Sequence, residues 1–309
     1  MPPTIERFAL TGELPIAMLA GVMPSASMRK AISGIARFGH TQAGELCFCD
    51  HDPGAEYSEI APGSLVLCTD GLAVTLGNRF PGITCLPVPD PRSLFIDLGH
   101  RLLAAGSVVV SDAIPRPFGI HPNAQIGAYT DIHPETRIDE GVHIGAHCVI
   151  HRGTWIQAGT LIRDNTMIGV AGINAYRGLD GKVRNFPHFA SVIIGPGVEI
   201  GAGTVVVRGI TTSTRIGVEC VIGNLCNIGH GVELGERVWL SVGTLVGGHT
   251  RIHDGATLGM SVAVKDNIVI GAGAQIGMGS VVVKSVPEDA SMFGNPARRV
   301  APIHAGPVR

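Results

Sequence analysis

Three consecutive residues, Gly229, His230 and Gly231, combine a proton acceptor with room for a second molecule. A neutral imidazole is the side chain best suited to take a proton near pH 7. The flanking glycines carry no side chain, so a substrate can approach His230 closely. The sequence therefore predicts that His230 acts as a general base.

The elements that position His230 follow from a repeat of six residues. An aliphatic residue, here called a rung, recurs at every sixth position over 120–168, 194–206 and 216–282. A small or β-branched residue usually stands two positions before the rung, and glycine often follows it. Two inward positions two residues apart indicate a short strand, and glycine indicates a sharp corner. A fixed short repeat of this kind predicts a solenoid.

This repeat resembles that of the hexapeptide-repeat acyltransferases. The resemblance implies a mainly β protein built on a left-handed parallel β-helix with three strands per coil. The 24 rungs of the sequence would then make about eight coils. We expect a small N-terminal α/β domain at residues 1–110, the β-helix at 111–286, and a short C-terminal tail at 287–309.

The repeat is interrupted twice, between residues 168 and 194 and between residues 206 and 216. Counting rungs in threes places both insertions on one edge of the three-sided coil. The same edge carries His230, Gly248 and Asn267. Loops that leave a regular scaffold at one place, together with glycines and polar groups, predict a binding cleft there.

Composition and charge exclude several classes of protein. The net charge is −2 and no basic run is interleaved with aromatic residues, so we expect no nucleic-acid partner. No uncharged apolar stretch of about 18 residues occurs, so we expect no transmembrane segment. The N-terminus lacks a basic region followed by an apolar one, which predicts a cytoplasmic protein. Cys148, Cys220 and Cys226 occupy the small inward position, which predicts buried thiols rather than disulfides.

The other histidines give weaker signals. His121, His133, His151 and His253 directly follow rungs, as exposed corner residues would. His249 and His253 are close in sequence, but counting rungs places them on different edges. We therefore expect no metal site.

Five segments extend the resemblance to one family, the UDP-3-O-(3-hydroxyacyl)glucosamine N-acyltransferases of lipid A synthesis. Residues 224–232 (NLCNIGHGV) resemble the catalytic segment of that family, and residues 169–195 resemble its long loop and the return to the β-helix. The Arg-Gly pair at 208–209 resembles the family's short insertion. Residues 32–36 and 44–48 resemble its nucleotide-binding domain, with Phe48 at the position of the uracil-stacking phenylalanine.

The resemblance implies a set of site residues. His230 would be the base, with Gly248 and Asn267 on the oxyanion side, where Asn267 stands in place of a second family histidine. The residues expected to bind substrate are Phe48, Tyr57, Asn174, Tyr176, His188, Asn224, Asn227 and His249.

The sequence also departs from the family. Tyr57 stands at a shifted position after Phe48, and Gly223 replaces an aspartate. The tail after Pro287 is short, whereas family members carry a helical extension that helps to recruit acyl carrier protein. Residues 293–300 (FGNPARRV) look more like the tails of transferases that use acyl-CoA.

The implied reaction is direct transfer of an acyl group, such as a 3-hydroxyacyl group, from a phosphopantetheine thioester to the amine of a UDP-aminosugar. The donor would be carried by acyl carrier protein or coenzyme A, no cofactor would be bound permanently, and the protein would be a homotrimer. No acyl-enzyme is expected, because Cys226 faces the core.

Two alternatives remain open. One is an acyl-CoA-dependent N-acyltransferase of another nucleotide aminosugar or amine, which the short tail favours. The other is a metalloenzyme similar to γ-carbonic anhydrase or a non-catalytic scaffold.

Overall fold

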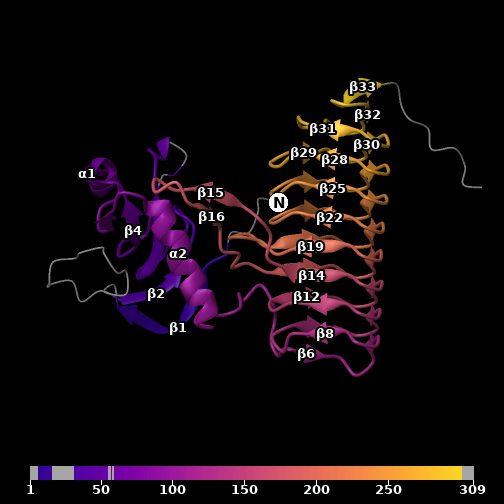
Figure 1. Ribbon diagram of the computed structural model, residues 1–309, viewed down its shortest axis with the longest axis horizontal. Coiled ribbons are helices and arrows are strands. Elements are labelled where there is room, and N and C mark those ends of the chain that lie inside the picture. The colour runs from indigo at the N-terminus through magenta and orange to yellow at the C-terminus, as the bar shows by residue number, and fades with distance from the viewer. Residues whose placement is uncertain (1–5, 16–30, 55–56, 58, 301–309) are drawn as a thin grey trace, which may run out of the picture. The chain divides into compact units, whose positions relative to one another are not determined.

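The computed structural model describes residues 6–15, 31–54, 57 and 59–300. Its contacts divide the chain into two compact units (Figure 1). Unit 1 comprises residues 1–111 and 173–189, and unit 2 comprises residues 112–172 and 190–309. Most of the long insertion in the six-residue repeat is therefore part of unit 1.

Unit 1 is a small α/β structure with one five-stranded sheet in the order β1-β2-β3-β4-β5. The strands β2 to β5 are parallel, and β1 is antiparallel to β2. The insertion adds a two-stranded hairpin. Its elements are β1 (Phe8–Pro15), β2 (Ala31–Ile35), β3 (Glu45–Cys49), β4 (Leu65–Cys68), α1 (Asp70–Arg79), β5 (Thr84–Pro87), α2 (Pro91–Ala104), β15 (Ala175–Arg177) and β16 (Val183–Asn185).

The two faces of this sheet carry different side chains, because successive residues of a strand point to opposite sides. Cys47 and Cys49 of β3 pack with Leu76 of α1 in one apolar cluster. Phe48, between them, packs against Phe95 of α2 with ring centroids 5.0 Å apart. Asp90 is the N-cap residue of α2, and its side chain accepts a hydrogen bond from the Ser93 N–H.

Unit 2 is a parallel β-helix with three sheets, and its strands pair in the register that the six-residue repeat predicts. Sheet A contains β6 (Gly119–Ile120), β9 (Arg137–Ile138), β12 (Thr154–Ile156), β17 (Val192–Ile194), β20 (Thr214–Ile216), β23 (Glu233–Leu234), β26 (Arg251–Ile252) and β29 (Val269–Ile270). Sheet B contains β7 (Gln125–Ile126), β10 (His143–Ile144), β13 (Leu161–Ile162), β18 (Glu199–Ile200), β21 (Val221–Ile222), β24 (Trp239–Leu240), β27 (Thr257–Leu258), β30 (Gln275–Ile276), β32 (Ser291–Phe293) and β33 (Arg298–Val300). Sheet C contains β8 (Asp131–Ile132), β11 (Val149–Ile150), β14 (Met167–Val170), β19 (Val205–Val207), β22 (Asn227–Ile228), β25 (Leu245–Val246), β28 (Ala263–Val264) and β31 (Val281–Val282).

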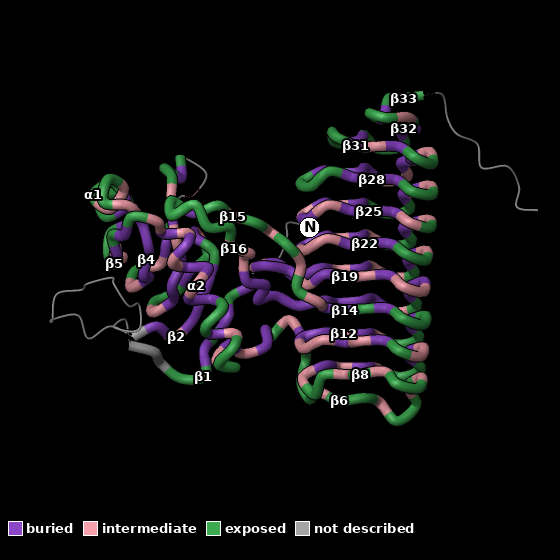
Figure 2. Tube along the Cα trace, viewed as in Figure 1, coloured by how far each residue is buried: buried purple, intermediate pink, exposed green. Residues whose placement is uncertain are grey.

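The 24 predicted rungs make eight coils, and the rungs from Ile138 onward are buried in one continuous core. The first coil differs: Ile120 is 48% exposed and Ile126 is 37% exposed. A rung is covered by the coils on both sides of it, and the first coil has a neighbour on one side only. Figure 2 shows this as exposed chain at β6 and buried chain along the later coils.

The inward position before each rung favours threonine for a specific reason. The Thr160 and Thr166 hydroxyls donate hydrogen bonds to the Gly195 and Gly201 carbonyl oxygens of the next coil. A buried hydroxyl with a backbone acceptor avoids the free-energy penalty of an unpaired polar group. The prediction of buried thiols is confirmed, since Cys148, Cys220 and Cys226 occupy the same inward position and are at most 2% exposed.

The segment expected as a separate tail continues the stack. Strand β32 pairs with β30 in parallel, and β33 folds back antiparallel to β32. Val286 also forms a parallel bridge with Ile270. The last coil is therefore covered by residues after Pro287.

In the part of the chain that the structure describes, no helix is long and apolar enough to cross a membrane.

Candidate functional site

Both insertions leave the β-helix at the corner that leads from sheet C to sheet A, as the count in threes predicts. Ile168 of β14 pairs with Val206 of β19, and Val206 pairs with Ile228 of β22. The chain thus departs from two neighbouring coils at the same corner. His230 follows directly on the next coil.

Residues at this corner stack one above another, because each coil repeats the path of the previous one. His230, Gly248 and Asp266 are each two residues after a rung, on successive coils. The His230 ring lies flat against Gly248: a Cβ atom added to Gly248 would be 2.4 Å from Cε1 of His230. Any other residue at position 248 would displace the imidazole, so this glycine defines where His230 lies.

His249 contacts His230 directly. The ring centroids are 4.8 Å apart with an interplanar angle of 74°, an edge-to-face contact. The His249 N–H also donates to the His230 carbonyl oxygen at 2.8 Å. The site therefore contains two imidazoles, one on each of two adjacent coils.

The surroundings of His230 favour its neutral form. Burial lowers the pKa of His230 below its ordinary value of 6.5, and the nearby Asp266 carboxylate opposes that shift in part. A neutral imidazole at pH 7 can accept a proton, as a general base must.

The backbone N–H of Gly248 is a candidate oxyanion donor. Gly248 is buried, and among the described residues its N–H has no hydrogen-bond acceptor. Buried backbone N–H groups are almost always paired. An unpaired one beside a basic histidine fits the role expected for Gly248, which stays a prediction.

The three asparagines expected at this site lie in different places. Asn267 lies at the same corner as His230, between sheets C and A, but one coil beyond His249. Its Nδ2 donates to Asp266 Oδ2 at 2.9 Å. Asn227 is exposed on β22. Asn224 lies at a different corner, from sheet B to sheet C, where its Oδ1 accepts from the Ala202 N–H.

The bond of Asn224 repeats elsewhere in the β-helix. Asp164 accepts from the Ala146 N–H, and Asp254 accepts from the Glu236 N–H, each from the next coil in the same way. Because the same bond forms at corners that do not carry His230, the Asn224 side chain has a structural use that needs no substrate.

The short insertion contributes residues that sequence reasoning missed. Thr214 Oγ1 donates to the Val207 carbonyl oxygen and accepts from the Gly231 N–H, at 2.6 and 2.9 Å. This links the insertion to the residue after His230. Thr212 is buried, and its Oγ1 lies close to Gly231: it would be 2.9 Å from a Cβ atom added there. The length of the insertion was visible in the sequence, but its folded path was not.

In unit 1, Phe48 and Tyr176 both contact one arginine. The Arg92 guanidinium is 5.6 Å from the Phe48 ring centroid and 4.9 Å from that of Tyr176, as cation–π contacts. Arg92 Nε also pairs with Asp50 Oδ2 at 2.8 Å. Phe48 and Tyr176, which are 128 positions apart in the sequence, thus share one partly exposed cluster.

The other unit 1 candidates lie apart from this cluster or inside the fold. Tyr57 packs edge-to-face on Phe38, with centroids 5.4 Å apart, in the cluster on the α1 face of the sheet. That is the face opposite Phe48. His188 is 3% exposed. The backbone of Asn174 is held by Asn185 and Phe186 at the base of the β15–β16 hairpin.

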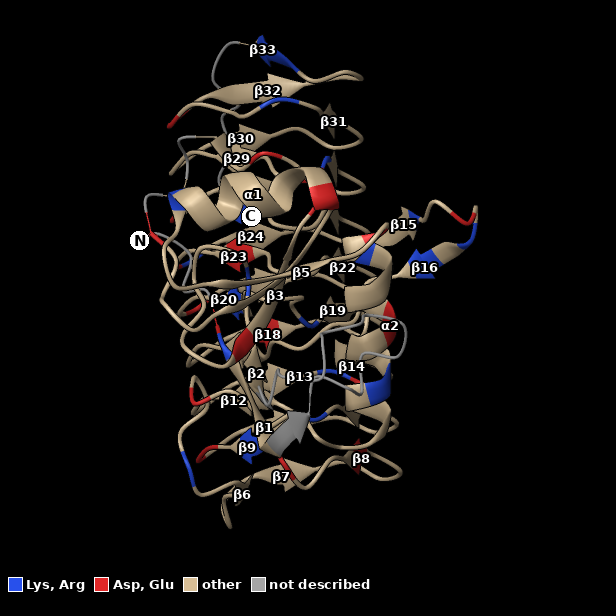
Figure 3. Cartoon of the chain, turned by 90° about the vertical axis from the view of Figure 1, so that its left-hand side faces the viewer, with Lys and Arg blue, Asp and Glu red and all other residues tan. Residues whose placement is uncertain are grey.

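Salt bridges fix this hairpin within unit 1. Arg184 pairs with Asp180 at 2.8 Å and with Asp97 of α2 at 3.1 Å. Figure 3 shows the acidic and basic residues grouped at the tip of β15 and β16.

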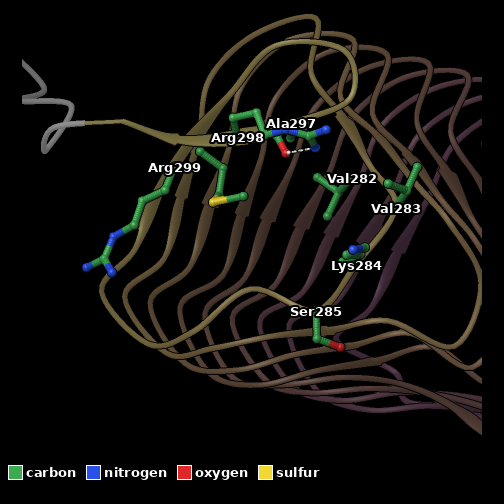
Figure 4. A pocket seen from close by; sticks show the side chains of 8 residues that line it. Val282, Val283, Lys284, Ser285, Ala297, Arg298 and Arg299 are labelled. Carbon is green, nitrogen blue, oxygen red and sulfur yellow. Dashed lines mark hydrogen bonds between the residues drawn. The ribbon is translucent and has the colours of Figure 1, made fainter.

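A separate pocket of about 320 Å³ lies at the last coil, lined by Val282, Val283, Lys284, Ser285, Met292, Ala297, Arg298 and Arg299 (Figure 4). The lining combines four apolar side chains and one serine with three cationic side chains. Among the described residues, no carboxylate forms a salt bridge with Lys284, Arg298 or Arg299. Lys284 lies at the same corner as His230 and three coils away, roughly 14 Å at about 4.8 Å per strand spacing.

Burial raises the pKa of the Cys226 thiol, which disfavours the reactive thiolate. No group of three or more His, Cys, Asp or Glu side chains is arranged to hold a metal ion within the described part of the chain.

Comparisons with known proteins agree with the repeat and with the fold. The family described as bacterial transferase hexapeptide (six repeats) matches residues 119–152. LpxA from Acinetobacter baumannii superposes with a TM-score of 0.52 at 24% identity, over 59% of this chain and 70% of that one. Unit 2 is thus a left-handed parallel β-helix, and the small N-terminal α/β region is present as predicted.

Relatives named as acyltransferases confirm the resemblance found in the sequence. A UDP-3-O-acylglucosamine N-acyltransferase of Caulobacter sp. (strain K31) is 39% identical over 137 residues, which are 44% of this chain and 40% of the relative. The corresponding protein of Methylobacterium nodulans is 36% identical over 140 residues, 45% of this chain and 40% of the relative. Serine acetyltransferase 2 of Arabidopsis thaliana is 42% identical over 108 residues, 35% of this chain and 31% of the relative. The chain spans 40% or less of the length of these relatives.

Asp266 offers a test of the His230 environment. Because its carboxylate raises the pKa of His230, Asp266→Asn should move that pKa further below 6.5. Titration of the His230 ring by NMR measures the shift. Glu236→Gln, at another corner of the same β-helix, should leave the titration unchanged. A wild-type His230 that titrates above 6.5, or an unchanged pKa in Asp266→Asn, contradicts this account.

Proposed function

We propose that the protein is an N-acyltransferase that transfers an acyl group from a phosphopantetheine thioester to the amine of a nucleotide aminosugar. One observation supports this most strongly. The imidazole of His230 lies against Gly248, a buried residue whose N–H has no acceptor among the described residues. A base next to an unused hydrogen-bond donor is the pair of groups that acyl transfer requires.

The reaction uses these groups in sequence. The amine nitrogen attacks the thioester carbonyl carbon while His230 takes a proton from the amine. The carbonyl oxygen becomes negatively charged and accepts a hydrogen bond from the Gly248 N–H. The carbon–sulfur bond then breaks, and the proton held by His230 passes to the departing thiolate. The products are an amide and a free thiol.

The acceptor belongs to the class of sugar nucleotides, by analogy with the relatives whose printed name is UDP-3-O-acylglucosamine N-acyltransferase. In unit 1, the aromatic rings of Phe48 and Tyr176 offer surfaces for a base, and Arg92 contacts both. Stacking of a base on an aromatic ring contributes about 1–3 kcal/mol.

The donor carrier has two candidates. Acyl carrier protein is the carrier implied by the family resemblance. The pocket at the last coil favours coenzyme A instead, because Lys284, Arg298 and Arg299 line it together with apolar side chains and, among the described residues, form no salt bridge. Lys284 and Ser285 of this pocket lie on the corner of His230, which suits a long phosphorylated arm whose other end reaches the base.

Measurement of products tests the reaction. Acyl carrier protein and acyl-CoA thioesters, each combined with UDP- or dTDP-aminosugars, should give an amide by mass spectrometry. His230→Ala should lower kcat by about 10²-fold or more while the melting temperature stays nearly unchanged. The exposed corner residue His253 is the matched control, and His253→Ala should retain full activity.

Three results contradict the assignment. They are the absence of product with every donor and acceptor pair, a His230→Ala protein that keeps more than about a tenth of kcat, and stoichiometric zinc in the active protein. The last result favours the metalloenzyme alternative.

Nucleotide binding can be tested separately. Phe48 packs on Phe95, so removing the whole ring would also damage the unit 1 core. Phe48→Leu keeps most of the volume but loses the flat ring, and should raise the dissociation constant for UDP by about tenfold. Tyr57→Phe, on the opposite face of the sheet, is the control. Equal affinity in wild type and Phe48→Leu, measured by calorimetry, rules out stacking on Phe48.

The assembly proposed is a homotrimer formed through unit 2. Large apolar side chains are exposed at the corner between sheets B and C, namely Leu225 at 67% and Met260 at 48%, and on the strands of these sheets, namely Trp239 of β24 and Leu245 of β25, each at 52%. Clustered exposed apolar groups mark interaction surfaces. Sedimentation should give a trimer at micromolar concentration, and Leu225→Glu combined with Met260→Glu should dissociate it. A monomeric wild type would refute the trimer.

A further inference from the structure

The chain after β32 closes the last coil with a turn that the β-helix holds in place. The Gly294 N–H donates to Ser280 Oγ at 3.0 Å, and the Gly294 carbonyl oxygen accepts from the Val281 N–H at 3.0 Å. The Ala297 N–H then donates to the Val281 carbonyl oxygen at 2.8 Å. Both ends of the turn are therefore bonded to β31 or to the residue before it, and β33 starts from a fixed place.

Two separate segments bring three cations to the pocket at this end of the β-helix (Figure 4). Lys284 follows β31, whereas Arg298 and Arg299 belong to β33. Among the described residues, none of the three forms a salt bridge. Like charges that line one pocket without a counter-ion repel one another, and a bound anion removes that repulsion. The pocket is thus suited to a ligand with several negative charges.

The rest of the lining suits a flat apolar group. Val282 and Ala297 are buried, and the thioether of Met292 is half-buried beside them. A methionine sulfur packs favourably against aromatic rings. The volume of about 320 Å³ falls in the range of small-molecule sites. An aromatic base that carries phosphate groups matches this combination of apolar and cationic side chains.

The pocket also lies at a suitable distance from the proposed base. Lys284 is at the corner of His230 and three coils further along, roughly 14 Å away by the spacing of neighbouring strands. From its ester oxygen to its sulfur, a pantetheine arm spans about four residue lengths, which is also roughly 14 Å in an extended chain. A phosphate held at Lys284 would thus place the thioester beside His230.

The two candidate carriers differ in what lies beyond this arm. In acyl carrier protein, the arm ends in a single phosphodiester on a folded domain, which carries one negative charge. In coenzyme A, it ends in a diphosphate, an adenine base and a ribose 3′-phosphate. Three cations around a cavity with apolar walls correspond to the second set of groups.

We propose that the pocket at the last coil binds the 3′-phosphorylated ADP end of coenzyme A, and that the protein thereby uses acyl-CoA as its donor. This inference rests on the proposed function. Lys284, Arg298 and Arg299 hold the phosphate groups, and the apolar side chains cover the adenine. These residues recognise the donor and take no part in bond making at the thioester.

Calorimetry on the full-length protein tests the site without any reaction. Coenzyme A should bind at least about tenfold more tightly than dephospho-coenzyme A, because only the 3′-phosphate is missing from the latter. Adenosine 3′,5′-bisphosphate should compete with coenzyme A. Arg298→Gln combined with Arg299→Gln should abolish the preference for the 3′-phosphate. Lys284→Gln, in the other segment, should raise the dissociation constant of coenzyme A by about tenfold.

A matched control removes the same amount of charge elsewhere. Arg237→Gln combined with Lys182→Gln neutralises two exposed cations outside the pocket, so it should leave the dissociation constant of coenzyme A unchanged. Kinetics give a second readout. In the double arginine variant, the ratio of kcat/KM for acyl-CoA to kcat/KM for acyl-pantetheine, which lacks the nucleotide, should fall by about tenfold, mainly through the KM of acyl-CoA.

Three binding results overturn the inference: equal affinity of the wild type for coenzyme A and dephospho-coenzyme A, unchanged affinity in the pocket variants, or equal weakening in the control variant. Faster acyl transfer from acyl carrier protein than from coenzyme A also overturns it, while the proposed reaction stands. Conversely, arginine-dependent binding of coenzyme A by a protein that forms no amide with any acceptor refutes the proposed reaction and upholds the pocket.

Discussion

The narrow core of the β-helix is the constraint on which the rest of the structure depends. Each strand sends two side chains inward, an aliphatic rung and a smaller residue before it, and the core has room for little else. Because every coil must repeat the previous one to fill this core, the corners are stacked in register. Residues 18 positions apart, such as His230 and Gly248, thereby become neighbours without any specific contact between their own side chains to hold them. The core therefore fixes the relative positions of the residues at the active corner.

Exceptions to the repeat carry the chemistry. The scaffold satisfies its own polar groups, since inward threonines bond to carbonyl oxygens and corner residues such as Asp164 and Asp254 bond to exposed N–H groups. At the corner between sheets C and A, the Gly248 N–H and the Thr212 hydroxyl have no partner among the described residues. Two unused hydrogen-bonding groups beside a neutral imidazole make this corner different from the others.

Periodicity explains which features the sequence could predict. The short strands and their spacing follow from counting. Given the three strands per coil that the family resemblance implies, the eight coils and the placing of both insertions at one corner follow as well. Features that depend on irregular chain were not accessible in the same way. Thr212 lies in an insertion without a period, and its place depends on Gly209 and Arg208. Phe48 and Tyr57 were both expected to bind substrate, and strand alternation puts Phe48 and the cluster of Tyr57 on opposite faces of one sheet. The exposed rungs Ile120 and Ile126 show a different limit. Their six-residue pattern is the same as that of the later rungs, although the first coil has a neighbouring coil on one side only.

The stacked register also sets how this chain can change in length. Removing 18 residues takes out one whole coil and leaves every later corner facing the same way. Removing six residues turns every later corner by one third of a coil, so that His230 would leave the edge that carries Arg208 and Thr212. Both deletions keep the six-residue pattern and an intact core. Two constraints therefore act on any gain or loss of residues during evolution. A change by a multiple of six residues keeps the fold, and only a change by a multiple of 18 residues keeps the functional residues on one edge.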